Sequence, residues 1–133
     1  MKEKGFSDAG AAGLMANLYV ESGLDPKNLQ NSFEKKLKYT NESYTQSVDN
    51  GSYKNFIHDR AGYGLAQWSY YSRKEKLLNY AKKNKKSIGD LYTQLDFLLT
   101  ELESYNLIKL LKTTNSVKKA TVEVMLEFER PAD

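Results

Sequence analysis

The chain has 133 residues, of which 40% are hydrophobic and 28% charged, and its formal net charge is +3. This length and composition predict one soluble globular domain, residues 1–133, with a core of its own. Because the chain has no Cys and a single His, His58, thiol catalysis, disulfides, thiolate metal sites and multi-histidine zinc sites are excluded.

Missing patterns exclude further classes of protein. No apolar run approaches the roughly 20 residues of a membrane span, and the start, MKEKGFSDAG, lacks the apolar core of a signal peptide. The chain also lacks a Gly-rich phosphate loop and a nucleophile-elbow sequence. We therefore expect no metal, no cofactor and no nucleic acid partner, and we expect carboxylates to be the catalytic groups if the chain is an enzyme.

Helical patterns dominate the first half of the chain. Ser7 is a candidate N-cap for a helix over about residues 8–20, and Gly23 is a natural C-terminal cap. Thr40 is a candidate N-cap for a short helix that closes before the turn dipeptide Asn50-Gly51. The face of the first helix that the spacing predicts to be buried consists of Ala11, Leu14, Met15, Leu18 and Ser22.

Helical patterns continue in the second half. Ser72 is a candidate N-cap for a helix through KEKLLNYAKKNKK, whose lysines are interpreted as a solvated face, with attraction to a polyanion as the alternative. Ser87 and Asp90 resemble a capping box that opens a buried central helix over residues 87–104. A last helix starts near Ser116 and is stopped by Pro131. The expected fold class is mainly α.

One segment does not fit a helix. FIHDRAGYGLAQW, residues 56–68, contains two glycines and a short alternation of aromatic and apolar residues. Such a pattern predicts a small β-hairpin or an ordered loop. His58, within this segment, is interpreted as a hydrogen-bonded structural residue, with a place in a cleft as the alternative.

Glu21 lies at the end of the first expected helix. It follows Leu18 by three residues and Leu14 by seven, which places it at the edge of the apolar stripe. Partial burial and the negative end of the helix dipole both disfavour a charged carboxylate. A glutamic acid that stays protonated near neutral pH is what general-acid chemistry requires. A surface glutamate with a lysine partner is the structural alternative.

Sequence motifs extend this hypothesis. NLYVESGLDP, residues 17–26, is followed by AGYGLAQW, residues 61–68, and the chain closes with FERPAD. In this order the motifs resemble the lysozyme superfamily, especially the phage tail lysozyme group and the related lytic transglycosylases, along nearly the whole chain. The resemblance implies a lysozyme-like helical domain with a small β-hairpin or ordered loop beside a cleft that holds a polysaccharide chain.

The resemblance also implies roles for single residues. Glu21 would be the general acid. Backbone close to Gly64 could approach a sugar, Gln67 could hydrogen-bond it, and aromatic faces could line the groove. Core packing is the alternative for Trp68. The expected substrate-binding residues are Ser22, Tyr63, Gly64, Gln67 and Trp68.

The second catalytic group has several candidates. Asp59 comes first as base or nucleophile, ahead of Asp49 and Asp25, although Asp at such positions is more often a turn or capping residue. Lytic transglycosylases need no second carboxylate, because a hydroxyl of the sugar itself attacks the anomeric carbon. Their Tyr-Asn motif has a weak counterpart in Tyr105-Asn106.

These features support two classes of function. The first is a muramidase that cleaves the β-1,4 bond between N-acetylmuramic acid and N-acetylglucosamine in peptidoglycan, with a lytic transglycosylase that forms 1,6-anhydromuramic ends as its enzymatic alternative. The second is a non-catalytic module that binds the cell wall. We expect a monomeric domain of a longer protein, located outside the cell, in the cell wall or in a phage virion.

Overall fold

The computed structural model describes residues 5–104 and 107–129 of the chain, and these residues form a mainly α fold, as predicted. Tyr105-Asn106 and residues 130–133, which include the predicted helix stop at Pro131 and most of FERPAD, lie outside the described residues. The helices are α1 (Asp8–Ser22), α2 (Asn31–Leu37), α3 (Asn41–Asp49), α4 (Tyr71–Lys83), α5 (Leu91–Ser104), α6 (Ile108–Thr113) and α7 (Val117–Glu129).

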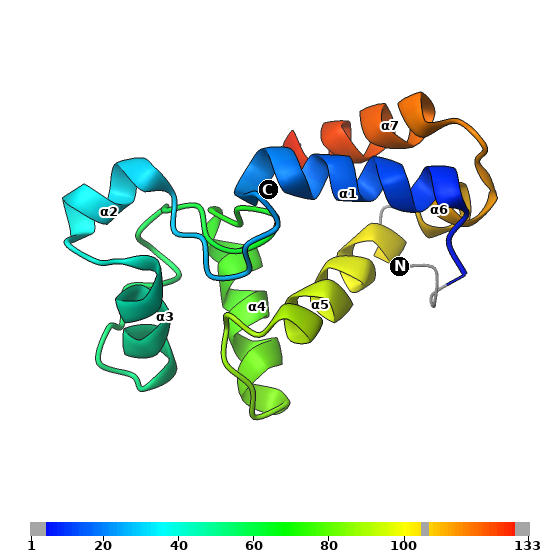
Figure 1. Ribbon diagram of the computed structural model, residues 1–133. Helices are drawn as coiled ribbons and strands as arrows, with labels where there is room; N and C mark the ends of the chain where they lie inside the picture. Colours follow the sequence, from blue (N-terminus) through cyan, green and yellow to red (C-terminus); the bar gives the residue numbers. More distant parts are fainter. Residues whose placement is uncertain (1–4, 105–106, 130–133) are drawn as a thin grey trace.

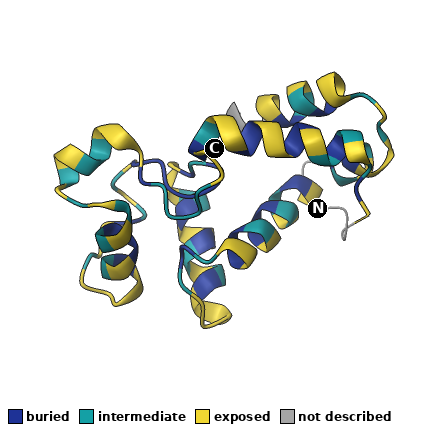
Figure 2. Ribbon diagram, in the orientation of Figure 1, coloured by how far each residue is buried: buried dark blue, intermediate teal, exposed yellow. Residues whose placement is uncertain are grey.

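The helices are arranged around α4 and α5. In Figure 1, α4 runs through the middle of the view, α2 and α3 lie to its left, and α1, α6 and α7 lie to its right. α7 packs alongside α1, α6 contacts α1, and α5 contacts both α4 and α6. Figure 2 shows that the buried residues of α1, α4 and α5 lie mainly on one side of each helix, whereas α2 has no buried residue.

Two helix starts were predicted correctly. The Ser7 hydroxyl accepts a hydrogen bond from the N–H of Gly10 (3.0 Å), and α1 ends at Gly23, whose φ is 65°. Thr40 caps α3 by accepting a hydrogen bond from the N–H of Ser43 (3.1 Å). Both caps satisfy backbone donors that a first helical turn leaves without a partner.

Two other predicted caps are wrong. α4 begins at Tyr71, so Ser72 lies inside the helix and Tyr70 occupies the N-cap position. The Ser87 hydroxyl donates to the carboxylate of Asp49 (2.5 Å) and does not cap α5. Asp90 accepts the hydrogen bonds from the hydroxyl and N–H of Thr93 (2.8 and 3.0 Å), and these bonds lower the pKa of the Asp90 carboxyl. α5 therefore begins at Leu91, later than the predicted start at residue 87, with Asp90 bonded to its first turn.

The predicted β-hairpin is not supported, whereas the alternative of an ordered loop describes the segment. Tyr63 and Trp68 exchange backbone hydrogen bonds of 3.1 and 3.0 Å, and Leu29 forms a second isolated bridge with Tyr63. These bridges do not extend into a strand within the described residues. Positive φ angles at Gly64 (81°) and Gln67 (50°) reverse the chain between the paired residues, so the arms stay short. We refer to residues 62–68 as the bridged loop.

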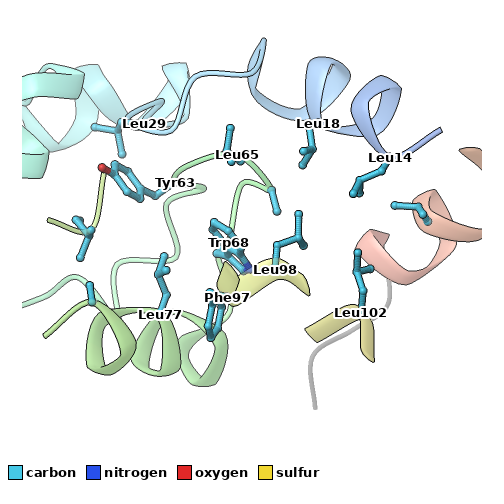
Figure 3. Close-up of a cluster of buried hydrophobic side chains, with 14 of the residues drawn as sticks. Leu14, Leu18, Leu29, Tyr63, Leu65, Trp68, Leu77, Phe97, Leu98 and Leu102 are labelled. Carbon is cyan, nitrogen blue, oxygen red and sulfur yellow. The ribbon is translucent and has the colours of Figure 1, made fainter. Parts of the chain in front are cut away.

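The bridged loop belongs to the core. Figure 3 shows Leu65 and Trp68 of this loop among the buried side chains of α1 and α5, with Leu18 and Leu98 close by. Leu77 of α4 belongs to the same buried cluster. The segment therefore keeps its shape through tertiary packing, although it has no extended strand partner.

The buried face of α1 differs from the prediction. Met15 is 39% exposed, whereas Gly10, Gly13 and Asn17 are buried. A Cβ atom at Gly13 would lie 2.5 Å from the Cβ of Ala120 in α7, and one at Gly10 would clash with the carbonyl of Leu111. Close approach of the α6 and α7 backbones therefore requires glycines on this face, which hydrophobic spacing does not reveal.

We predict that Gly10→Ala lowers the free energy of unfolding by about 1–3 kcal/mol, the usual cost of overpacking, even though Ala favours a helix over Gly by roughly 0.5–1 kcal/mol. The added methyl group would displace the carbonyl of Leu111. Denaturant unfolding measures the change, with Ala12→Ser on the exposed face of α1 as control. A stabilised Gly10→Ala variant would contradict the packing described here.

Candidate functional site

Glu21 lies in the last turn of α1 and is half-buried. The residues before it, Tyr19 and Val20, are exposed, and the last turn of α1 contains no basic residue. Gly23 and Leu24 both have positive φ (65° and 66°), so the chain turns away directly after the helix. The carboxyl group is thus attached to the negative end of the helix dipole, at the border between core and surface.

Ser22 is buried and closes the helix. Its hydroxyl donates to the carbonyl of Leu18 (3.0 Å), and its own carbonyl accepts a hydrogen bond from the side-chain amide of Asn28 (2.8 Å). These contacts account for Ser22 as the last residue of α1. A direct contact between Ser22 and substrate stays a prediction.

Asn28 connects the end of α1 to the bridged loop. Its carbonyl accepts hydrogen bonds from the N–H of Gly64 (2.9 Å) and from the side-chain amide of Gln67 (2.8 Å). Through Ser22, Asn28 and Gln67, the two sequence motifs are joined by consecutive hydrogen bonds. The sequence analysis missed Asn28, because an asparagine in a turn gives no signal of long-range contacts.

Gln94 of α5 makes a second connection to the bridged loop. Its side chain is fully buried, and its Oε1 accepts a hydrogen bond from the N–H of Leu65 (2.9 Å). Its Nε2 donates to the carbonyls of Pro26 and Ile88, both at 2.6 Å. A buried amide is costly unless it is hydrogen-bonded, and here it holds the loop and the segment after α1 against α5.

Tyr63 and Trp68 point into the protein and are both fully buried. The Tyr63 hydroxyl lies 2.5 Å from the hydroxyl of Thr45, and burial raises the pKa of this phenol. Trp68 Nε1 donates to Glu101 (2.8 Å), whose carboxylate also accepts two 2.8 Å hydrogen bonds from Arg73. Trp68 is therefore packed in the core, and its contact with substrate stays a prediction. Sequence reasoning missed its hydrogen-bond partner Glu101, which lies on α5.

Gly64 and Gln67 also make contacts within the fold. Gly64 has φ 81°, and a Cβ atom there would lie 2.8–3.0 Å from the side-chain amide of Gln94, so this amide is the close neighbour that requires glycine. Gln67 is half-buried, and its Nε2 donates to the carbonyls of Asn28 and Gly64 (2.8 and 3.1 Å). Contacts of either residue with a sugar stay predictions.

Asp59 forms a buried ion pair. Its side chain is 1% exposed, and its Oδ1 lies 2.6 Å from the Nζ of Lys74. Its Oδ1 also accepts the N–H of Ala61 (2.9 Å), and its Oδ2 accepts the hydroxyls of Tyr44 and Tyr53 (2.6 and 2.7 Å). These four contacts surround the carboxylate. They favour a structural role for Asp59, and its predicted role as base or nucleophile stays a prediction that the contacts do not favour.

Lys74 is the buried partner of this pair and the exception to the interpretation of the lysine-rich stretch as a solvated face, because its other lysines are exposed as predicted. Its Nζ also donates to the carbonyl of Ala61 (2.8 Å) and lies 4.3 Å from the ring centroid of Phe56. Burial lowers the pKa of the Lys74 ammonium, and the charge of Asp59 acts against this effect. Lys74 precedes the buried Leu77 and Ala81 by three and seven residues, a spacing that could have revealed it.

The other two candidate carboxylates have structural contacts. Asp25 accepts the N–H of Lys27 (2.9 Å), and Asp49 accepts the N–H of Ile88 (2.9 Å). No group of three His, Cys, Asp or Glu side chains in the described part of the chain could hold a metal ion. Among the same residues, no helix is long and apolar enough to cross a lipid bilayer.

We predict that Lys74→Met lowers the free energy of unfolding by about 3–5 kcal/mol, because it leaves the Asp59 carboxylate buried without its ammonium partner. The double variant Asp59→Asn with Lys74→Met should regain part of this loss, since it removes both charges. Chemical denaturation of both variants and of Lys76→Met, an exposed control on the same helix, measures the effect. Equal stabilities of the Lys74→Met and Lys76→Met variants would refute it.

Comparison with known proteins identifies the family. A family model described as phage tail lysozyme matches residues 1–133. Neither the curated proteins nor the solved structures gave a match. The match includes the end of α1 and the bridged loop, the two motifs that hydrogen bonds of Asn28 connect. The chain belongs to the phage tail lysozyme family.

Proposed function

We propose that the chain cleaves peptidoglycan at the β-1,4 bond between N-acetylmuramic acid and N-acetylglucosamine, with Glu21 as the general acid. The observation that carries this proposal is the position of Glu21, half-buried at the C-terminal end of α1 in a member of the phage tail lysozyme family. In this role the Glu21 carboxyl donates its proton to the glycosidic oxygen as the bond to the anomeric carbon breaks.

The contacts of the five predicted substrate-binding residues favour a supporting role for most of them. Ser22, Tyr63, Gly64, Gln67 and Trp68 hold the loop and the helix end in place. Of this group, Gln67 is only partly buried, which leaves it the best placed to contact a sugar. Pre-organised positioning of this kind supports catalysis without direct contact, because the acid must lie within hydrogen-bond reach of the leaving oxygen. We further propose that the domain acts as a monomer, as part of a longer protein in a phage virion or at the cell wall.

The attacking group distinguishes two enzymatic mechanisms. A muramidase uses water and a second carboxylate as base or nucleophile. In a lytic transglycosylase, a hydroxyl of the muramic acid attacks the anomeric carbon, and 1,6-anhydro ends result. The engagement of Asp59, Asp49 and Asp25 in contacts within the fold is the observation that favours the second mechanism. Family membership favours the first.

We predict that Glu21→Gln lowers the cleavage rate by roughly 10²–10⁴-fold, the usual contribution of a general acid, because the amide keeps the shape but cannot donate that proton. Release of soluble fragments from purified peptidoglycan measures the rate, and circular dichroism checks the fold. Glu75→Gln, an exposed glutamate of α4, is the matched control.

Two results would contradict the proposal. Cleavage by Glu21→Gln at the wild-type rate would remove Glu21 from the mechanism. A folded wild-type protein that binds peptidoglycan and releases nothing would identify a non-catalytic wall-binding module.

Mass analysis of the products separates the two enzymatic mechanisms. Hydrolysis leaves reducing muramic acid ends, whereas transglycosylation leaves anhydro ends that are lighter by one water. We predict reducing ends, in line with the family, and a mild effect of Asp59→Asn on the rate per folded molecule, in line with the buried ion pair, which would leave Asp49 or Asp25 as the second carboxylate. A loss of activity in folded Asp59→Asn as large as that in Glu21→Gln would instead make Asp59 the second catalytic carboxylate.

A further inference from the structure

A hollow of about 460 Å³ lies where the chain enters and leaves the bridged loop. Its lining residues come from the segment before the loop and from the start of α4: Ile57, His58, Arg60, Ser69, Tyr70 and Tyr71. The volume falls within the ~300–1,000 Å³ that is usual for small-ligand sites. Because Tyr63 pairs antiparallel with Trp68, the two arms that carry these residues emerge side by side.

Aromatic rings form one wall of this hollow. Tyr70 and Tyr71 are 40% and 51% exposed, and their ring centroids lie 5.0 Å apart. The His58 ring stacks on Tyr71 at 6.2 Å with an interplanar angle of 23°. Three adjacent rings at the surface offer flat apolar faces with polar edges, which suit the apolar face of a sugar ring and its hydroxyls.

Arg60 adds a positive charge to the same hollow. It is exposed, and no hydrogen bond or ion pair engages its guanidinium among the residues that the structure describes. Its neighbour Asp59 is paired with Lys74 inside the protein, so the charge of Arg60 is not cancelled by the adjacent carboxylate. A guanidinium binds carboxylates through two parallel hydrogen bonds and is suited to an acidic ligand group.

The walls of the hollow are fixed to each other. Asp59 belongs to the segment before the loop, and Lys74 lies in the first turn of α4, so their buried ion pair joins the two sides. The N–H of Lys74 also donates to the carbonyl of Tyr70 (3.0 Å). Arg60 has a φ of 61°, between the anchored Asp59 and Ala61. A ligand would meet a largely pre-formed site, which reduces the entropic cost of binding.

We propose that this hollow binds a peptide-bearing muramic acid unit of the glycan strand, with the sugar ring on Tyr70 and Tyr71 and a free carboxylate of the peptide stem on Arg60. The lactyl carboxyl of such a unit is in amide linkage to the stem, so the negative charge that Arg60 would meet belongs to the peptide. The inference rests on the proposed function for the identity of the polymer. It explains why aromatic and cationic side chains are exposed together next to the buried Asp59–Lys74 ion pair.

Binding without turnover tests this proposal. Dissociation constants are measured by calorimetry in the Glu21→Gln background for two soluble probes, a peptide-bearing muropeptide tetrasaccharide and the neutral N-acetylglucosamine tetramer. We expect Arg60→Gln to weaken binding of the muropeptide roughly 10-fold or more, as for a lost charge-assisted hydrogen bond, and to leave the neutral probe unchanged. Tyr71→Ala should weaken both probes. Lys82→Gln, an exposed lysine in the last turn of α4, controls for net charge.

The outcomes separate this inference from the proposed function. If Arg60→Gln and Tyr71→Ala bind both probes as tightly as their parent does, the hollow is not a sugar site, whatever the effect of Glu21→Gln on cleavage. If Lys82→Gln weakens muropeptide binding as much as Arg60→Gln, the effect is general electrostatic attraction and the proposal is wrong. If Glu21→Gln still cleaves, binding is measured before the probes are consumed. The proposal is then supported only if Arg60→Gln weakens binding of the muropeptide and not of the neutral tetramer, and it is wrong if the two probes are affected alike.

Discussion

The buried ion pair between Asp59 and Lys74 holds the centre of the molecule together. It joins the segment that leads into the bridged loop to α4, and Tyr44 brings α3 to the same carboxylate. Removing two charges from water is costly, and only close pairing with further hydrogen bonds offsets that cost. Here the carboxylate has three hydrogen bonds besides the ammonium, from Tyr44, Tyr53 and the backbone of Ala61. The loop between the paired residues can therefore stay irregular and still have one conformation.

The side-chain amides of two residues also hold the bridged loop in place. Asn28 joins the end of α1 to the loop, and Gln94 joins α5 to the loop and to the segment after α1. A loop without strand partners must satisfy its backbone groups in some other way, and amides can donate and accept at once. The residues that resemble a substrate-binding motif thus make contacts within the fold, and Asn28 connects them to the end of α1, where Glu21 lies.

The proposed enzyme would use two parts of this structure, the end of α1 and the hollow. In the proposed mechanism Glu21 would supply the proton, and it lies at the end of a helix that α6 and α7 hold by close contact with its glycines. The buried ion pair under the loop also joins the two segments whose exposed aromatic and cationic residues line the hollow beside Tyr71. The hollow is therefore positioned by the buried ion pair, whereas the end of α1 is connected to the bridged loop through Ser22 and Asn28.

The sequence by itself determined the helical class, the caps at Ser7 and Thr40, the end of α1 at Gly23 and the family, because these depend on local spacing and on motifs along the chain. Only the tertiary structure decided what the motif residues touch. Trp68 and Tyr63 turned inward because α5 and α3 offer them buried partners, and Asp59 became one half of an ion pair because Lys74 lies on the inner face of α4. Ser87, predicted as a helix cap, lies before α5 and bonds to Asp49 of α3. These contacts join residues that are far apart in the chain, so no local sequence pattern predicts them.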